Sequence, residues 1–279
     1  MTLLSIGDQV KEGTYPFHSR FHRAANFWCD KQLVSVVSEE VGDGPLNIVI
    51  SDFDGQSMPG EPAPLMITTN TVILGNNRFE FTDDDYYCST VALDDWEPRL
   101  FDHNLSVLAE ELRTAASPKS LAFLLDERRI MSFRPGFERA FTEQIQHGVQ
   151  QMINGHLLAG VRTLRGCGLG LTPSGDDFIA GLLIGLNLLQ RLRGQNYQEI
   201  VDEVFRAAKT GNVFSNSFLD LARRGLLFGR MKDLVLALMS ESEEMVRKSA
   251  ARLMDIGGSS GADLGTGFLL TVRGEMGVS

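Results

Sequence analysis

The chain has 279 residues, of which 43% are hydrophobic and 22% are charged, so it is long enough to bury at least one substantial core. Its formal net charge of −10 excludes nucleic acid as an expected partner, because phosphate contacts require a basic face. The three cysteines, Cys29, Cys88 and Cys167, are widely spaced and form no Cys-x-x-Cys pair. This pattern indicates reduced thiols rather than a disulfide framework or a zinc site.

Targeting and membrane-spanning features are not expected in this sequence. The first residues lack the basic region and the long apolar stretch of a secretory signal. The most apolar segment, residues 178–189, is shorter than the roughly 20 residues that a membrane-spanning helix needs. We therefore expect a soluble, cytoplasmic protein with no membrane partner.

The N-terminal part, residues 1–115, is predicted to be a β-rich domain. β-Branched residues and period-two alternation predict strands at residues 33–37, 47–51, 66–74 and 79–82. Turn-forming segments separate them, and Gly75-Asn76-Asn77 between two extended runs predicts a hairpin.

The remaining residues, 116–279, are predicted to form a mainly helical domain, so the expected fold class is α+β. The pattern becomes helical from about residue 104. Apolar residues at every fourth position from Phe141 to Leu157 predict one buried stripe on a long helix. Further helices are predicted at residues 105–115, 121–129, 177–192, 198–209, 217–227, 241–254 and 264–272.

A glycine-dense loop, Gly-Cys-Gly-Leu-Gly-Leu-Thr-Pro-Ser-Gly-Asp-Asp at residues 166–177, leads directly into one of these helices. Glycine lets backbone amides approach a ligand without a Cβ in the way. Thr, Ser and Asp are residue types that cap a helix N-terminus, where free N–H groups and the helix dipole attract phosphate or carboxylate. The predicted anion contacts are Gly168, Gly170, Thr172, Ser174 and Gly175.

A second copy of this turn occurs near the C-terminus. The pattern Ser-Gly-x-Asp-x-x-x-Gly begins at Ser174 and again at Ser260, an offset of 86 residues (260 − 174), and apolar residues follow both copies. Ser259, Ser260 and Gly261 are the predicted anion contacts of the second turn. Ordinary helix capping favours the same residue types, but the glycine-dense loop and the duplication favour a functional site. We expect the two turns to face one another across a cleft.

Three aspartates in these turns, Asp176, Asp177 and Asp263, are the predicted catalytic residues. A carboxylate here can accept a proton, hold Mg²⁺ as a hard oxygen ligand, or cap the helix, and the sequence leaves these roles open. Mg²⁺ is accordingly a possible cofactor. Arg165 beside the loop, and Arg20 in the basic run 18–23, are candidates to bind an anionic substrate.

Other known site types do not fit the sequence. Gly170 and Gly175 have the spacing of a nucleotide-binding P-loop, but Asp176 and Asp177 replace its Lys and Ser/Thr, and the glycines do not form a dinucleotide-binding G-x-G-x-x-G. His18 and His22 could chelate a metal from a helix, but no third ligand accompanies them. Cys167 lies in the glycine loop, where we expect a thiolate to be stabilised, but no histidine is adjacent to it.

Three segments of the sequence resemble one family. Gly-Leu-Gly-Leu-Thr-Pro-Ser-Gly-Asp-Asp-Phe-Ile-Ala-Gly (168–181), Gly-Ser-Ser-Gly-Ala-Asp (258–263) and His-Ser-x-Phe-x-x-Ala-x-Asn-Phe (18–27) are similar to the DUF2877 family. Its members are loosely labelled carboxylases and include the small subunit of a three-subunit oxamate carbamoyltransferase of anaerobic allantoin breakdown.

The resemblance implies that oxalurate and phosphate are converted to oxamate and carbamoyl phosphate by a hetero-oligomer. The Ser-Thr-Arg-Thr phosphate loop of aspartate and ornithine carbamoyltransferases is missing, so this activity would require another fold. The carboxylase label has no support, since the sequence contains neither a biotinylation Met-Lys-Met nor a nucleotide loop.

Three functions remain open from the sequence. The first is a subunit of an oxamate carbamoyltransferase-like enzyme that binds small anions at the paired helix N-termini. The second is a Mg²⁺-dependent hydrolase, because Asp176-Asp177 before a Gly/Ala-rich helix is similar to the helical ADP-ribosyl hydrolases. The third is a non-catalytic subunit that binds an anion or completes a shared site.

Overall fold

The computed structural model describes residues 1–29, 32–58, 60, 62–93, 96–240 and 242–277. Strands occupy the N-terminal part and helices follow from residue 98, so the predicted α+β class is confirmed. The chain divides into two compact units, the first formed by Met1–Thr90 with Leu226–Lys232, and the second by Val91–Gly225 with Asp233–Ser279. These contact-based units place residues 91–115 with the helices, whereas the domain ranges 1–115 and 116–279 remain a prediction from sequence.

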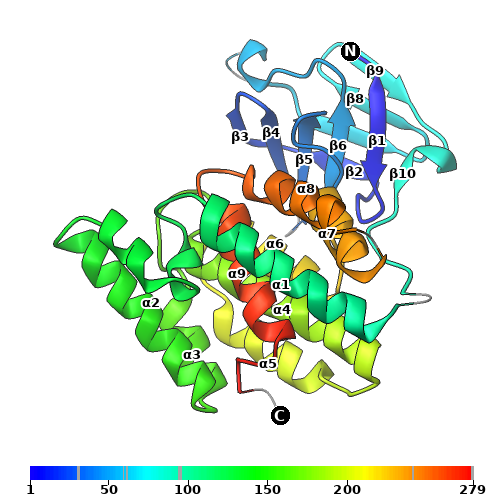
Figure 1. The fold of residues 1–279 in the computed structure, drawn as a ribbon. Coiled ribbons are helices and arrows are strands. Elements are labelled where there is room, and N and C mark those ends of the chain that lie inside the picture. The colour runs from blue at the N-terminus through cyan, green and yellow to red at the C-terminus, as the bar shows by residue number, and fades with distance from the viewer. Residues whose placement is uncertain (30–31, 59, 61, 94–95, 241, 278–279) are drawn as a thin grey trace. The chain divides into compact units, whose positions relative to one another are not determined.

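Two sheets form the first unit. A six-stranded mixed sheet has the order β10-β1-β6-β5-β4-β3, and a four-stranded antiparallel sheet has the order β2-β7-β8-β9 (Figure 1). The strands are β1 (Leu3–Gly7), β2 (Gly13–Tyr15), β3 (Phe17–Phe21), β4 (Ala24–Cys29), β5 (Gln32–Ser38), β6 (Asn47–Ile50), β7 (Leu65–Thr68), β8 (Thr71–Leu74), β9 (Asn77–Glu80) and β10 (Tyr86–Tyr87), with 3-10 turns η1 (Gly55–Ser57) and η2 (Asp83–Asp85).

Alternate residues of both sheets meet in one core. Val34 and Val36 of β5 and Leu65 and Ile67 of β7 belong to the same buried cluster, as period-two alternation requires. The strands predicted at 33–37 and 47–51 are β5 and β6. The single strand predicted at 66–74 is wrong, because residues 69–70 form a two-residue turn between β7 and β8. The predicted hairpin at Gly75 is confirmed between β8 and β9.

Helices make up most of the second unit. The α-helices of the chain are α1 (Pro98–Ala115), α2 (Phe137–Ile153), α3 (Leu157–Leu164), α4 (Ser174–Arg193), α5 (Gln198–Ala208), α6 (Val213–Arg223), α7 (Gly229–Ser240), α8 (Glu243–Met254) and α9 (Ser260–Val272), with 3-10 helices η3 (Leu121–Leu124) and η4 (Glu127–Ser132). α4 and α9 pack against each other and are buried on nearly all sides (Figure 1). A helix that is apolar all round is expected at the centre of a core.

Two helix predictions require correction. The helix predicted at residues 121–129 is a pair of 3-10 segments, η3 and η4. The stripe from Phe141 to Leu157 does not lie on one helix, because α2 ends at Ile153 and Gly155 turns the chain with φ of 82° before α3 begins. A spacing of four residues drifts around a helix by about 40° per step, so Ile145 is buried while Ile153 is 46% exposed.

The other predicted helices are present. α1 begins at Pro98, well before the predicted start at residue 105, and the remaining described ends are shifted by a few residues. The predicted start of α8 at Glu241 lies outside the described residues. Helix α7 lies between the helices predicted at residues 217–227 and 241–254 and is not predicted from the sequence. Within the described part of the chain, no helix is both long enough and apolar enough to cross a membrane.

Candidate functional site

The two Ser-Gly-x-Asp turns begin the two central helices of the second unit. α4 begins at Ser174 after Pro173, and α9 begins at Ser260 after Ser259. Gly181 lies against the backbone of Leu264, and Gly185 further along α4 lies against Thr271 further along α9. The helices therefore run in the same direction, with their N-termini at the same end.

Each turn is hydrogen-bonded to the aspartate of the other turn. The Ser174 side chain bonds to Asp263, and the Ser260 side chain bonds to Asp177. Because Ser174 corresponds to Ser260 and Asp177 to Asp263 at the offset of 86 residues, the arrangement has approximate two-fold symmetry. The duplicated motif is thus the source of a reciprocal pair of serine–carboxyl contacts.

Further donors surround the two aspartates unequally. The backbone N–H of Leu121 in η3 donates to Asp263 Oδ1 at 2.6 Å, and Ser259 Oγ donates to Oδ2 at 2.9 Å. Asp177 Oδ2 accepts from Thr172 Oγ1 at 3.3 Å. The symmetry is therefore broken around the carboxyl groups, where Asp263 has the larger set of donors among the described residues.

Burial makes both carboxyl groups weak acids. Asp177 is 2% exposed and Asp263 is 0% exposed. Burial raises the pKa of Asp263 to about 7, against the effect of its hydrogen bonds from Leu121, Ser174 and Ser259. Burial also raises the pKa of Asp177 well above its ordinary range, and the neighbouring Asp263 and Asp176 raise it further. A carboxyl group with the pKa of Asp263 can hold or release a proton near neutral pH.

Asp176 has a different environment from the other two aspartates. Its Oδ1 accepts the backbone N–H of Gly166 at 2.6 Å, which fastens the start of the glycine loop to α4. Its Oδ2 is buried without a hydrogen-bond partner among the described residues. A polar atom in this condition carries a desolvation cost that a bound donor would remove.

The helix N-termini offer fewer free amides than the sequence predicts. In α4, the N–H of Gly175 donates to Cys167, and those of Asp176 and Asp177 donate to Pro173. In α9, the N–H of Gly261 donates to Ile256, and that of Asp263 donates to Ser259. The serine hydroxyls, rather than these five amides, are therefore the polar groups that the turns can present to a ligand.

Glycine serves two different purposes in the turns. A Cβ at Gly175 would overlap the carbonyl oxygen of Leu164, and one at Gly261 would overlap that of Leu253, so both glycines are required for close helix packing. Gly168 and Gly170 have φ of 125° and 105°, which favour glycine for conformational reasons. Close packing accounts for glycine at positions 175 and 261, and contact of these two residues with an anion stays a prediction.

The remaining predicted residues are placed as follows. Arg165 donates to the carbonyl of Ala207 at the end of α5, at 3.0 Å. Arg20 lies on β3 in the first unit, where it donates to the carbonyl of Met58 at 2.6 Å. The structure therefore gives both arginines protein partners, and their binding of a substrate remains a prediction.

Cys167 does not have the environment of a stabilised thiolate. Burial, together with the charge of Asp176, raises the pKa of its thiol, which donates to the carbonyl of Thr163 at 3.1 Å. Gln144 of α2 donates to the sulfur at 2.9 Å. The expectation that the glycine loop stabilises a thiolate is wrong, because burial and the charge of Asp176 both disfavour the ionised thiol.

No metal-binding arrangement is apparent in the described part of the chain, where no group of three or more His, Cys, Asp or Glu residues could hold an ion. The helical chelate considered for His18 and His22 is wrong, since His18 lies on β3 and the turn after that strand contains His22, which contacts Asp54 at 3.1 Å. At the paired turns, both oxygens of Asp263 already accept hydrogen bonds.

One contact of the site had no signal in the sequence. Leu121 supplies its backbone N–H from 142 positions before Asp263. A backbone donor leaves no trace in residue type, so only the fold of η3 against α9 could identify it.

These observations define a helical unit organised around a duplicated turn with two buried, weakly acidic carboxyl groups. The family model described as oxamate carbamoyltransferase subunit AllH matches residues 164–272, from the last residue of α3 to the last residue of α9. The match contains both turns and confirms the family resemblance predicted from their motifs. Neither a curated protein nor a solved structure shows a significant match to the chain.

Proposed function

We propose that this chain is a subunit of an oxamate carbamoyltransferase-like enzyme of allantoin degradation, which converts oxalurate and phosphate to oxamate and carbamoyl phosphate. The reciprocal pairing of Ser174 with Asp263 and Ser260 with Asp177 carries the proposal. The match to a carbamoyltransferase subunit family covers these four residues. We assign the paired turns as the site where the small anions bind, with Mg²⁺ not required by the chemistry described below.

The reaction requires one proton to move. A phosphate oxygen attacks the carbamoyl carbon, the bond from that carbon to the oxamate nitrogen breaks, and the nitrogen takes up a proton. The proton carried by hydrogen phosphate balances this demand. A carboxyl group with a pKa near 7, such as that of Asp263, can accept the proton of hydrogen phosphate and then donate it to the leaving nitrogen with little energetic cost.

Ser174 is the proposed route between the buried acid and the substrate. Asp263 is fully buried, whereas Ser174 is only partly buried and bonds to it. When Asp263 is protonated and donates to Ser174, the serine hydroxyl hydrogen is available to an anion. When Asp263 is ionised, the same hydroxyl donates to the carboxylate instead. Asp263 thus controls whether Ser174 presents a donor, and Ser260 has the same relationship to Asp177.

The test is an assay of carbamoyl phosphate formation from oxalurate and phosphate, using the purified chain alone and in the complex with its partner subunits. We expect the wild-type complex to be active and the Ser174→Ala and Ser260→Ala complexes to lose at least tenfold in kcat/KM. Ser217→Ala is the matched control, because Ser217 bonds only within α6 to Val213 at 2.8 Å in the described structure. A complex that forms no carbamoyl phosphate would refute the proposal.

The same assay separates two roles of the chain. Activity of the purified chain alone would identify it as the catalytic subunit. Activity only in the complex, with the two serine variants still defective, would support a shared site to which this chain contributes. Serine variants that match Ser217→Ala in the active complex would remove the paired turns from the site.

A further inference from the structure

Two buried side-chain atoms of the second unit have no hydrogen-bond partner among the described residues. They are Asp176 Oδ2, on α4, and Ser215 Oγ, on α6. Each residue is only 1% exposed, so surface water does not solvate these atoms. A polar group in this state carries an uncompensated desolvation cost. The pair therefore offers one acceptor and one hydroxyl donor that the described part of the protein does not use.

The contact between helices α4 and α6 brings their first turns together. At one end of this contact, Asn187 of α4 donates to the carbonyl of Ala222 in α6 at 3.0 Å. At the other end, Asn212, the N-cap residue of α6, donates to the carbonyl of Leu171 in the glycine loop at 2.8 Å. The two helices therefore run in the same direction, and both begin beside the glycine loop.

Asp176 and Ser215 lie on the facing sides of these helices. In α6, the buried residues Ser215, Leu219 and Ala222 recur at spacings of four and three, which is one side of a helix. In α4, Asp176 lies 11 positions before Asn187 (187 − 176), about three helical turns, so the two residues share one side. Because Asn187 contacts Ala222, these two sides face each other. The two unpartnered atoms nevertheless form no hydrogen bond with each other.

The glycine loop fixes which oxygen of Asp176 is available. Its Oδ1 accepts the backbone N–H of Gly166 at 2.6 Å, so Oδ2 is the oxygen left to accept from a ligand. Ser215 is held by its backbone N–H, which donates to Asn212 Oδ1 at 3.2 Å, and its hydroxyl remains to donate. A ligand group that uses both residues must donate and accept through neighbouring atoms. A primary amide does so with its NH2 and its carbonyl oxygen.

We propose that Asp176 and Ser215 form the subsite for the carbamoyl group of the substrate, with the amide NH2 donating to Asp176 Oδ2 and the carbonyl oxygen accepting from Ser215 Oγ. The inference rests on the proposed function and names the part of oxalurate that these two residues bind. Ser174 lies two positions before Asp176 in the first turn of α4, so a carboxylate bound at the serine leaves the amide end beside Asp176. A carbonyl that accepts from Ser215 is also polarised for attack by phosphate.

The glycine loop borders this subsite and controls entry to it. Leu169 is 83% exposed and Leu171 is 44% exposed, so the tip of the loop is not packed into the core. Hydrogen bonds hold the loop on either side of the tip, from Gly166 to Asp176 and from Asn212 to Leu171. Displacement of the tip uncovers little apolar surface that is not already exposed. The ligand therefore reaches the buried pair when the tip moves aside.

The test compares two ligands of the same charge and nearly the same shape, oxamate and pyruvate. Pyruvate carries a methyl group where oxamate carries the amide NH2, so it can accept from Ser215 but cannot donate to Asp176. Isothermal titration calorimetry on the complex of the full-length chain with its partner subunits measures both affinities. We expect the wild type to bind oxamate at least about tenfold more tightly, because a site that hydrogen-bonds an N–H group rejects an analogue without it.

Substitutions at the two residues separate their contributions. In Asp176→Asn, the Gly166 N–H still requires the side-chain oxygen, so the amide nitrogen takes the position of Oδ2 and the acceptor is lost. This variant should bind oxamate and pyruvate within about threefold of each other. Ser215→Ala should weaken both ligands at least about fivefold and keep the preference for oxamate, since both ligands carry the carbonyl.

Ser217→Ala on the same helix is the matched control and should leave both affinities unchanged, because Ser217 bonds within α6 to Val213. Folding of each variant is verified by its circular dichroism spectrum and melting temperature. If Asp176→Asn does not fold, the comparison of the two ligands in the wild type and in Ser215→Ala decides the proposal.

A preference for oxamate that is lost in Asp176→Asn and kept in Ser215→Ala supports the carbamoyl subsite. Failure of oxamate to bind, equal affinity of the wild type for both ligands, or a preference that survives Asp176→Asn overturns it. A complex that forms carbamoyl phosphate without this preference would remove the subsite and leave the proposed function in place. A complex that shows the preference but forms no carbamoyl phosphate would keep the amide subsite and refute the proposed function.

Discussion

Gly181 and Gly267 occupy equivalent positions on opposite sides of the contact between α4 and α9. A Cβ at Gly181 would overlap the carbonyl oxygen of Leu264, and a Cβ at Gly267 would overlap that of Phe178. The contacted residues are themselves separated by the same 86 positions (264 − 178) as the two glycines. The duplication therefore includes the helix packing as well as the Ser-Gly-x-Asp turns.

Substitution of either glycine should separate the two helices. Gly181→Ala and Gly267→Ala each place a methyl group against backbone that cannot move aside as a flexible side chain can, and overpacking of a core costs about 1–3 kcal/mol. We expect each variant to lower the free energy of unfolding, measured by chemical denaturation, by at least about 1 kcal/mol. Gly211→Ala is the control, since a Cβ there meets nothing within 4 Å. Equal stability of all three variants would contradict this packing.

The raised pKa of Asp263 predicts a pH-dependent contribution to stability. Burial raises this pKa from its ordinary value of 3.8 to about 7, so the folded state favours the protonated form. The stability that Asp263 contributes to the folded state is fully present below about pH 4 and is lost as the pH rises through about 7. Each unit of pKa shift corresponds to about 1.4 kcal/mol of this stability. We expect the difference in unfolding free energy between wild type and Asp263→Asn to decrease over this range.

Asp202 provides a control with the opposite sign. The hydrogen bond from Arg223 lowers the pKa of the exposed Asp202 carboxyl. Its contribution should be present at neutral pH and be lost as the pH falls through its lowered pKa. The same pH series on Asp202→Asn should therefore show the reverse trend. A parallel pH dependence in the two variants would contradict the assigned burial effect at Asp263.

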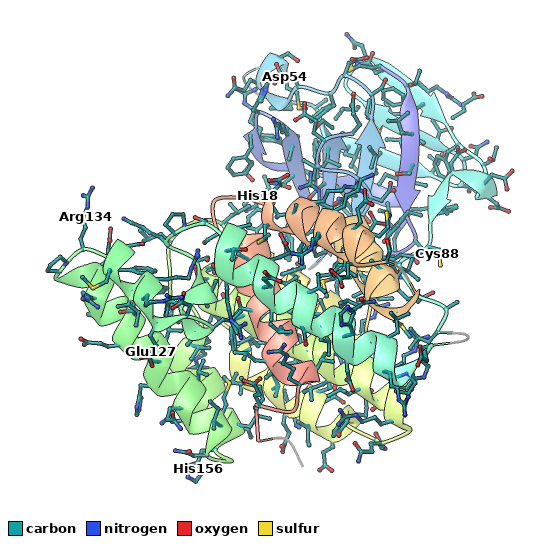
Figure 2. All side chains as sticks on the ribbon, in the orientation of Figure 1. His18, Asp54, Cys88, Glu127, Arg134 and His156 are labelled. Atoms are coloured by element: carbon teal, nitrogen blue, oxygen red, sulfur yellow. The ribbon has the colours of Figure 1, made fainter. Side chains whose placement is uncertain are left out.

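The cysteines should differ in their reactivity toward alkylating reagents. Hydrogen bonds with Thr90 lower the pKa of the exposed Cys88 thiol, whereas burial raises that of Cys167 (Figure 2). Because the thiolate is the reactive form, we expect iodoacetamide at pH 8 to label Cys88 at least tenfold faster than Cys167. Peptide mass spectrometry over time measures both rates, and Cys88→Ser identifies the fast phase. Faster labelling of Cys167 would show that the glycine loop opens.

The sequence predicted best those elements whose burial pattern is regular. The α+β order, strands β5 and β6, and helices α4 and α9 follow from hydrophobic periodicity. Strand β3 was missed because its residues, Phe-His-Ser-Arg-Phe, are largely polar and include a bulge that interrupts the alternation. The predicted buried stripe does not extend to Ile153 at the end of α2, because a spacing of four residues does not match the roughly 3.6 residues per turn of an α-helix.

The candidate site was predictable in its residues but not in its connections. Duplication of Ser-Gly-x-Asp identified Ser174, Asp177, Ser260 and Asp263 from sequence alone. The exchange of partners between the turns was not predictable, because N-cap residue types indicate bonds within their own helix rather than to another helix. The contact of Leu121 with Asp263 depends on the tertiary fold for the same reason.

Ser174→Ala should alter the acidity of an aspartate on the other helix. The hydrogen bond from Ser174 lowers the pKa of Asp263 against the larger effect of burial, so its removal should raise this pKa above about 7. Carbon-detected NMR titration of the aspartate carboxyl signals measures the change directly, with Asp263→Asn assigning the resonance. In Ser260→Ala, the carboxyl that loses its serine partner is Asp177, so its pKa should rise instead. If Ser174→Ala acted on Asp177 and left Asp263 unchanged, each turn would bond to its own aspartate, and the reciprocal arrangement at the centre of the proposed site would be wrong.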